Sequence, residues 1–435
     1  MRIIKTAQIR ENVVFINIQN NFMLLKLCLI FTIIIFSFSE STAMTLVDSK
    51  TSTLQEAINK ASDFDTLLII GHHKVDDLQV NKPLTLEGVD GSVIDGEERG
   101  QTITITANNV SIKNLTIMNS GRGHMRDYSA IRMIKVSNCI IENNRLINNF
   151  FGIHLEETTK STISNNTVEN DNRLDSQSKM GNGIHLWNSN NNEIINNTIK
   201  NHRDGIYLEF SNNNKINQNK SFNSARYGLH FMFSNNNLFI NNNFRSNLGG
   251  VAVMYSENIE ISRNRFSGHI KPGTSSLLLK EIKRSKISEN NFRDNTISVH
   301  MDSTDEILFL KNTFTNNGIA IRILGSSYDN RFISNNFIAN NFDITTNRAD
   351  LSNKFSKNYW DKYVGYDTDK DNIGEVPYRP ITLFSIILEK IPNSVLLLES
   401  YIVSLIDSIE LYLPVLTHTQ FIDLEPRISL ERRFE

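Results

Sequence analysis

The chain has little cysteine, little proline and no excess of either charge. It contains 2 cysteines and 7 prolines in 435 residues. Cys28 lies in an apolar N-terminal stretch, so only Cys139 remains beyond it, and one thiol provides neither an internal disulfide nor a thiolate metal cage. The few prolines argue against a disordered, low-complexity chain. The 45 Lys and Arg are scattered among 47 Asp and Glu, which argues against a nucleic-acid partner.

Long apolar runs are also scarce. The N-terminal run from Leu27 to Phe38 follows Lys26 and is shorter than the roughly 20 residues that a membrane-spanning helix needs. Small residues up to Ala43 complete the pattern of a secretory signal peptide. We therefore predict a signal peptide over residues 1–43, with Met23 as an alternative start, and a periplasmic mature protein. An uncleaved N-terminal membrane anchor is the alternative.

What the chain does have is an internal repeat. A segment of the form Gly-Ile-His-Leu, followed by Ser and Asn residues, starts at Gly152, Gly183, Gly205, Gly228 and Gly250, and more loosely at Ser276, Ser298 and Ala320. A spacing of 22 residues is too short for two packed helices but fits one coil of short strands. The repeat predicts an all-β fold, a right-handed parallel β-helix.

Two apolar columns recur within the repeat. The first is Ile163, Ile194, Ile216, Phe239, Ile261, Ile287, Phe309 and Phe332, and the second is Val168, Ile199, Phe222, Phe244, Phe266, Phe292, Phe314 and Phe337. Stacked coils place equivalent residues about 4.8 Å apart, so both columns should line the interior. Asn-Asn pairs lie at the predicted corners, where asparagine tolerates a left-handed backbone and can form amide ladders.

The predicted organisation has four parts. After the signal peptide, residues 44–358 form the β-helix, residues 359–380 an acidic connecting segment and residues 381–435 an apolar helical tail. Helical spacing of Leu54, Ala57, Ile58 and Ala61 predicts a short helix that caps the N-terminal end of the coil. Longer repeats at 120–130, 170–182 and 267–275 predict loops that are available for partners.

The residue between Ile and Leu of each repeat should point outward. These outward positions are His154, His185, Tyr207, His230, Ala252, Leu278, His300 and Arg322, followed two residues later by Glu156, Trp187, Glu209, Met232, Met254, Lys280 and Asp302. His230, Met232 and Met254 combine imidazole and thioether donors, which suit Cu(I). We predict a copper site there, with His154, His185 and His300 as weaker candidates. An ordinary solvated sheet face is the alternative.

The segment from Asp367 through Asp369 and Asp371 to Glu375 spaces carboxylates as a calcium-binding loop does. Asn372 stands where that motif has glycine, and Tyr378 replaces its final glutamate, so a solvated turn is an equal alternative. Beyond Pro380, apolar stretches at 383–391 and 395–413 predict helices that cap the coil or dock on a membrane protein.

Three segments resemble the NosD family of nitrous oxide reductase maturation proteins. They are residues 226–234 (RYGLHFMFS), residues 250–256 (GVAVMYS) and the stretch from Asn358-Tyr-Trp-Asp to Pro377-Tyr-Arg-Pro380. The likeness covers nearly the whole mature chain. It departs from the family at Asn372, where glycine is expected, and in the charged end from Glu425.

The resemblance implies a periplasmic, non-enzymatic accessory protein. Such a protein works with an ABC-type ATPase and a membrane subunit to mature the copper sites of nitrous oxide reductase, and it receives copper from a lipoprotein chaperone. The cargo is either copper or sulfur. A carbohydrate-active β-helix enzyme is one alternative, although Glu156 and Glu209 do not form the close acid pair that hydrolysis needs. A passive surface-binding solenoid is another.

Overall fold

The computed structural model describes residues 43–123, 126–171, 180–348, 352–398, 400–412 and 421–430. Residues 1–42 of the predicted signal peptide lie outside these residues, as do His124 and Met125 of the first inserted loop and most of the second loop. From Thr45 onward the chain forms one compact unit.

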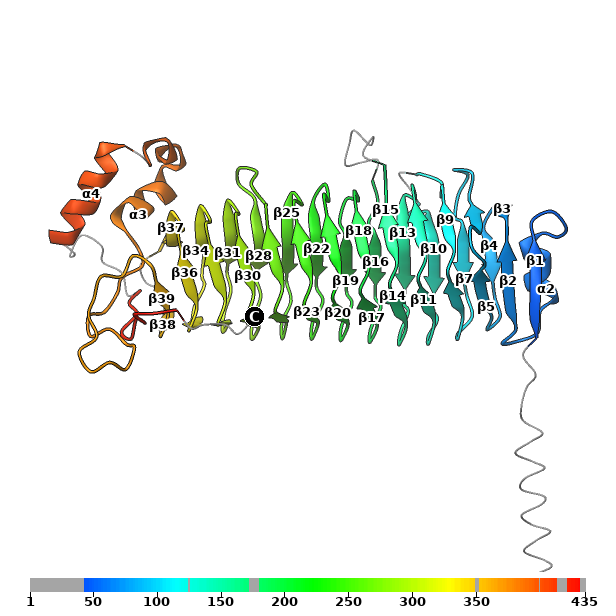
Figure 1. Cartoon of the computed structure of the whole chain (residues 1–435), viewed down its shortest axis with the longest axis horizontal. Coiled ribbons are helices and arrows are strands. Elements are labelled where there is room, and N and C mark those ends of the chain that lie inside the picture. Colours follow the sequence, from blue (N-terminus) through cyan, green and yellow to red (C-terminus); the bar gives the residue numbers. More distant parts are fainter. Residues whose placement is uncertain are drawn as a thin grey trace, which may run out of the picture. The chain divides into compact units, whose positions relative to one another are not determined.

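Three parallel sheets run along the length of this unit (Figure 1). Successive coils contribute one strand to each sheet, so each strand pairs with its counterparts in the coils before and after it. The prediction of a parallel β-helix is confirmed.

The first sheet has 14 strands: β1 (Met44–Asp48), β2 (Thr66–Ile70), β5 (Thr85–Gly88), β8 (Ser111–Lys113), β11 (Ile140–Glu142), β14 (Thr162–Ser164), β17 (Glu193–Ile195), β20 (Lys215–Asn217), β23 (Leu238–Ile240), β26 (Glu260–Ser262), β29 (Lys286–Ser288), β32 (Leu308–Leu310), β35 (Arg331–Ile333) and β38 (Lys354–Ser356). The second has 13: β3 (His72–Lys74), β6 (Val93–Asp95), β9 (Thr116–Met118), β12 (Arg145–Ile147), β15 (Thr167–Glu169), β18 (Thr198–Lys200), β21 (Lys220–Phe222), β24 (Asn243–Arg245), β27 (Arg265–Ser267), β30 (Asn291–Arg293), β33 (Thr313–Thr315), β36 (Asn336–Ile338) and β39 (Tyr359–Trp360). The third has 12: β4 (Leu78–Val80), β7 (Ile103–Ile105), β10 (Ser129–Ile134), β13 (Phe151–Glu156), β16 (Ile184–Trp187), β19 (Ile206–Glu209), β22 (Tyr227–Met232), β25 (Gly249–Met254), β28 (Ser275–Lys280), β31 (Ile297–Asp302), β34 (Ile319–Leu324) and β37 (Phe342–Thr346).

The interior is one continuous apolar cluster that both predicted columns help to build. The first column is confirmed, because all of its members are buried and consecutive members pair in register. The second is wrong at one position. Ser221 rather than Phe222 pairs with Ile199 and Phe244 and faces the interior. The corner residue Asn219 fixes this register, so alternation turns Phe222 outward whatever its hydrophobicity.

The two asparagines of each Asn-Asn pair have different roles at the corner. The first asparagine takes a left-handed backbone, as at Asn143 with φ 57° and Asn165 with φ 57°. The second is buried and forms a ladder with its counterparts in neighbouring coils. In this ladder Asn242 donates from Nδ2 to Oδ1 of Asn264 at 3.0 Å and to the carbonyl of Ile216 at 3.0 Å. The ladder thus satisfies backbone groups that each tight corner leaves unpaired.

Helices lie at both ends of the stack of coils. The short helix α2 (Leu54–Lys60) buries Leu54 and Ile58 against the core, and the hydroxyl of Thr53 caps its N-terminus. At the other end lie α3 (Leu383–Lys390), the 3-10 helix η2 (Pro392–Leu397) and α4 (Tyr401–Tyr412). Within the described part of the chain, every helix is too short or too polar to cross a membrane.

The chain then returns to the coil at Phe421–Leu430, where the sequence predicts a continued helical tail. Asp423 accepts hydrogen bonds from Nδ2 of Asn358 at 2.9 Å and from Nε1 of Trp360 at 3.1 Å. Asn358 is the last asparagine of the ladder, so Asp423 occupies the place that a further asparagine would take. The helices α3 and α4 are therefore part of an excursion that starts and ends at the last coil.

Candidate metal site on the outer face of the third sheet

The third sheet aligns the predicted outward residues in one row. The register pairs His154 with His185, His185 with Tyr207, Tyr207 with His230 and His230 with Ala252. Met232 pairs with Met254 in the same two strands, β22 and β25. Because His230 and Met232 are two residues apart in one strand, their side chains leave the same face of the sheet.

The alternative of an ordinary solvated sheet face is wrong for most of this row. His154, His185, Tyr207 and His230 are between 5 and 8% exposed, and Ala252 is fully buried. The four rings stack on one another, with centroid separations of 4.7, 4.8 and 4.7 Å along the row. We refer to these four rings as the ring stack. Neighbouring rings, spaced by the pitch of the coil, exclude water from one another's faces.

Several imidazole nitrogens of the ring stack are buried with no hydrogen-bond partner among the described residues. They are Nδ1 of His154, both ring nitrogens of His185 and Nε2 of His230. Burial lowers the pKa of His154 to about 4 and that of His185 well below its usual range. The neutral form, which is the form that binds metal ions, is therefore favoured at both positions.

His230 differs from the other imidazoles because its Nδ1 faces a buried ion pair. Nδ1 lies 3.5 Å from Oδ2 of Asp204 and 3.4 Å from Nη2 of Arg226. Burial alone raises the pKa of Asp204, but the hydrogen bonds from Arg226 and the contact with His230 outweigh this effect and lower it to about 2. Asp204 is thus an ionised carboxylate at neutral pH.

Soft and polar donors meet at the His230 end of the stack. The hydroxyl of Tyr207 donates to the sulfur of Met232 at 3.6 Å, while its ring lies against His230. Met232 and Met254 are both half-buried and stand at the ends of β22 and β25. The structure therefore brings the predicted residues His230, Met232 and Met254 to one place on the sheet.

The weaker candidates lie elsewhere. His154 and His185 belong to the far end of the ring stack, separated from His230 by Tyr207. His300 lies three coils from His230 on the other side, about 14 Å away at the sheet spacing. Burial, followed by the charge of Arg322, lowers the pKa of His300.

Tyr207 was not predicted to lie beside the sulfur of Met232, and Asp204 and Arg226 were not predicted to lie beside His230. Signals for two of them were present. Tyr207 occupies the histidine position of its repeat, and Asp204 immediately precedes the repeat glycine Gly205. The row of outward residues contained the first signal, and the separation of 22 residues between Asp204 and Arg226 is the length of one coil, which places the two residues on neighbouring coils.

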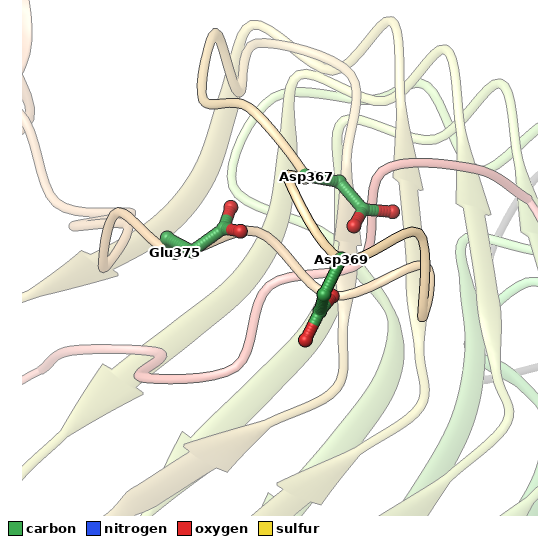
Figure 2. Close-up of side chains that lie close together, drawn as sticks. All are labelled: Asp367, Asp369 and Glu375. Carbon is green, nitrogen blue, oxygen red and sulfur yellow. The ribbon is translucent and has the colours of Figure 1, made fainter.

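The acidic segment brings together a different trio from the one predicted. Carboxylate oxygens of Asp367, Asp369 and Glu375 lie within 4.8 Å of one another, and Figure 2 shows these three side chains on one loop. Asp371 is not in this group, and its Oδ1 accepts the N–H of Ile373 at 2.7 Å. Calcium binding by this loop stays a prediction.

Hydrogen bonds within the acidic loop, and from it to the rest of the protein, also account for its polar residues. Asp367 accepts the N–H of Lys370 at 2.6 Å and that of Asn372 at 2.9 Å. Asn372 has a left-handed backbone with φ 71°, and its Oδ1 accepts the N–H of Ser429 at 3.0 Å. Asparagine in place of the expected glycine therefore ties the acidic loop to the returning segment Phe421–Leu430.

Comparisons with known proteins agree with the repeat and the motifs. Residues 170–378 match the family model described as "Periplasmic copper-binding protein (NosD)". The "Probable ABC transporter binding protein NosD" of Pseudomonas aeruginosa is 30% identical over 370 residues, which cover 81% of this chain and 85% of that protein.

Solved structures share the fold at low sequence identity. A mannuronic acid-specific polysaccharide family 6 lyase from human gut microbiota superposes with a TM-score of 0.60 at 14% identity, covering 73% of this chain and 87% of the lyase. A family 28 exopolygalacturonase of Yersinia enterocolitica gives 0.55 at 12% identity, covering 73% and 78%. At these identities the likeness concerns the fold and not the chemistry.

Proposed function

Because the chain belongs to the NosD family, we propose that it is a periplasmic accessory protein that binds Cu(I) as cargo. In this proposal the protein works with an ABC-type ATPase and membrane subunit to mature the copper sites of nitrous oxide reductase. A lipoprotein chaperone supplies the copper. The family description as copper-binding and the relative's name as an ABC transporter binding protein support this proposal.

One observation about the site carries the proposal. Nε2 of His230 is buried without a hydrogen-bond partner among the described residues, close to where Tyr207 meets the Met232 sulfur. Buried polar atoms without partners are uncommon and call for an explanation. A soft monovalent ion that takes ligands from imidazole and thioether groups provides one.

The arrangement suits cargo better than a permanently held ion. Met232 and Met254, the two candidate thioether ligands, are half-buried, whereas His230 is 5% exposed. Neutral thioethers bind Cu(I) without a proton having to leave, so an incoming protein could exchange its own ligands for these. In this scheme the methionines meet the ion first and His230 completes its coordination.

Anaerobic titration with Cu(I) against a chromophoric chelator tests the site. The variant His230→Gln/Met232→Leu/Met254→Leu should lose roughly 100-fold or more in affinity, since it removes the ligands themselves rather than their supporting groups. Its fold should be kept, because none of the three side chains belongs to the interior columns. The matched control is His72→Gln/Met118→Leu, which removes one histidine and one methionine from the second sheet.

The same variants decide the biological role. In cells, the triple variant should fail to support an active nitrous oxide reductase, whereas the control should support it fully. Parent-like Cu(I) affinity together with an active reductase would place the site elsewhere. The loop with His124 and Met125, which lies outside the described residues, would then be the next candidate.

We assign contact with the membrane subunit to the C-terminal helices. Large apolar side chains in this region are exposed, among them Leu396, Tyr401, Ile402, Leu405 and Ile409. Several large apolar side chains exposed on neighbouring short helices favour a surface that a partner covers. Replacing Leu396, Ile402 and Leu405 by Asn should abolish co-purification with the ABC transporter while leaving Cu(I) affinity unchanged.

A carbohydrate-active enzyme and a passive surface-binding solenoid are the competing proposals. The first draws on the shared fold with the lyase and the exopolygalacturonase. Glu156, however, pairs with Arg132 at 2.7 Å, and Trp187 separates it from Glu209 in the register. Two coils correspond to about 10 Å, which exceeds the separation of about 5 to 9.5 Å that the two acids of a glycoside hydrolase need. We therefore favour a non-enzymatic role.

A further inference from the structure

The ion pair beside His230 has an arrangement that a simple salt bridge does not require. The side chain of Asp204 is completely buried, whereas that of Arg226 is about one third exposed. Oδ1 of Asp204 accepts from Nε of Arg226 at 2.8 Å and from the N–H of Tyr227 at 3.1 Å. Oδ2 also accepts from Nη2 of Arg226, and it is the oxygen that faces Nδ1 of His230.

The two-point contact with Arg226 fixes the rotation of the Asp204 carboxylate. A bidentate guanidinium holds the carboxylate in its own plane, and the N–H of Tyr227 removes the remaining freedom. Oδ2 is thereby directed at the imidazole, whose ring stacks on the ring of Tyr207 and also contacts the ring of Tyr227 at a tilt. Both partners of the Asp204 and His230 contact are positioned by other groups.

Two arrangements of hydrogen are compatible with the contacts of Nδ1. Either Nδ1 carries the proton and donates to Asp204, or Nη2 of Arg226 donates to an unprotonated Nδ1. The second arrangement puts the proton on Nε2, where it would be a buried N–H without an acceptor among the described residues. Orphaned buried donors are rarer than under-used acceptors, so the first arrangement is favoured.

We propose that Asp204 is a positioning residue that holds the proton of His230 on Nδ1 and so keeps the lone pair of Nε2 free for a soft metal ion. The consequence for copper rests on the proposed function, but the placement of the proton does not. When an ion binds at Nε2, its positive charge makes Nδ1–H a stronger donor and tightens its contact with the carboxylate. Carboxylates orient metal-binding histidines in this way in many metal sites.

The first test uses the mature protein without copper. Histidine labelled with 15N reports which ring nitrogen carries the proton, and His230→Gln identifies its signals. We expect His230 of the parent to be protonated on Nδ1. In Asp204→Asn the population should shift toward protonation on Nε2, because Arg226 becomes the competing donor to Nδ1. The matched control is Glu156→Gln, which removes a carboxylate from an ion pair on the same sheet and should leave the His230 signals unchanged.

The second test adds Cu(I). Affinity should fall by about 10- to 100-fold in Asp204→Asn, the usual loss when a supporting carboxylate is removed, and it should stay at the parent value in Glu156→Gln. Asp204→Glu, which keeps the charge, should recover part of the affinity. A purely structural ion pair would change the melting temperature without changing the position of the proton.

The outcomes separate the two proposals. Protonation of the parent on Nε2, or an unchanged proton position and affinity in Asp204→Asn, would overturn the role of Asp204. If the parent is protonated on Nδ1 but its His230 signals do not respond to Cu(I), the copper site is wrong and the positioning role stands. Should Asp204→Asn not fold, Arg226→Gln keeps the carboxylate. Protonation on Nδ1 must persist in that variant, and a shift to Nε2 would assign the role to Arg226.

Discussion

At the scale of single residues, the buried asparagine ladders explain where the coil tolerates other side chains and at what cost. His269 occupies a ladder position between Asn247 and Asn295, and its Nδ1 lies 3.0 Å from Oδ1 of Asn295. Nε2 of His269 is buried without a partner in the described part of the chain. An imidazole thus fills the place of an amide but leaves one polar atom unsatisfied.

This substitution makes the coil sensitive to acid. Burial, opposed by the hydrogen bond to Asn295, lowers the pKa of His269 from 6.5 to about 4. The unfolded chain therefore binds the proton first, and stability that is fully present above pH 6.5 is lost as the pH falls toward 4. The loss is on the order of 3 kcal/mol for this residue.

We predict that His269→Asn reduces this acid sensitivity. The amide restores the ladder and removes a titrating group. Between pH 7 and pH 4, the free energy of unfolding, measured with urea, should therefore fall by about 2 to 3 kcal/mol less in the variant than in the parent. Other buried histidines keep part of the acid sensitivity, among them His154 and His202, whose pKa values are also lowered to about 4 by burial. An identical loss in variant and parent would contradict the prediction.

For the outward side chains of the third sheet, the sequence predicts their direction but not their burial. Alternation predicted correctly which side chains of the third sheet leave its outer face, because strand geometry is local. It did not predict that those residues are buried. His185 and Tyr207 are covered by the rings of the coils before and after them, whereas His154 and His230 have such a ring on one side only and also contact Phe151 and Tyr227. Their burial depends on neighbours that are 22 to 31 residues away.

At the scale of elements, a buried ion pair joins α3 to the coil. Glu389 of α3 accepts from Arg322 of β34 through Nε at 2.8 Å and Nη2 at 2.6 Å, and from the hydroxyl of Thr345 of β37 at 2.8 Å. Apolar contacts of Phe384 with Phe342 lie beside it. The helix was predicted from its apolar spacing, but this anchor was not, since 67 residues separate its two partners.

Glu389→Gln should therefore loosen the C-terminal helices without unfolding the coil. The side chain of Glu389 is 3% exposed, and its loss leaves Arg322 with a neutral partner, which costs about 2 kcal/mol after allowance for the partial exposure of the arginine. Amide hydrogen exchange should rise in residues 383–412 and stay unchanged in β25 and β28. The control Arg284→Gln breaks an exposed pair with Glu257 and should change stability by about 0.5 kcal/mol or less.

At the scale of the whole molecule, the sequence repeat was sufficient for the architecture because each coil contacts only its neighbours. The closure of the C-terminal end was not predictable in this way. Asp423 accepts the hydrogen bond from the side-chain amide of Asn358, which lies 65 residues earlier in the chain. Nothing in the local sequence of Phe421–Leu430 resembles a coil. The repeat predicts how one coil pairs with the next. The last coil has no following coil, and a segment distant in sequence, Phe421–Leu430, takes the place of that coil.

The continuous core leads to a prediction about proteolysis. Interior columns pass without a break from coil to coil, so cleavage between regular coils would expose apolar rings such as Phe239 and Phe244. We expect limited proteolysis to cut first at exposed loops, at Ile270 in the insertion 267–275 and near Val364 and Tyr366 in the acidic segment. The cut chain should remain associated and elute as one species in size-exclusion chromatography. A stable fragment that ends inside the regular coils, for example near residue 240, would show that the coil divides into separate folding units.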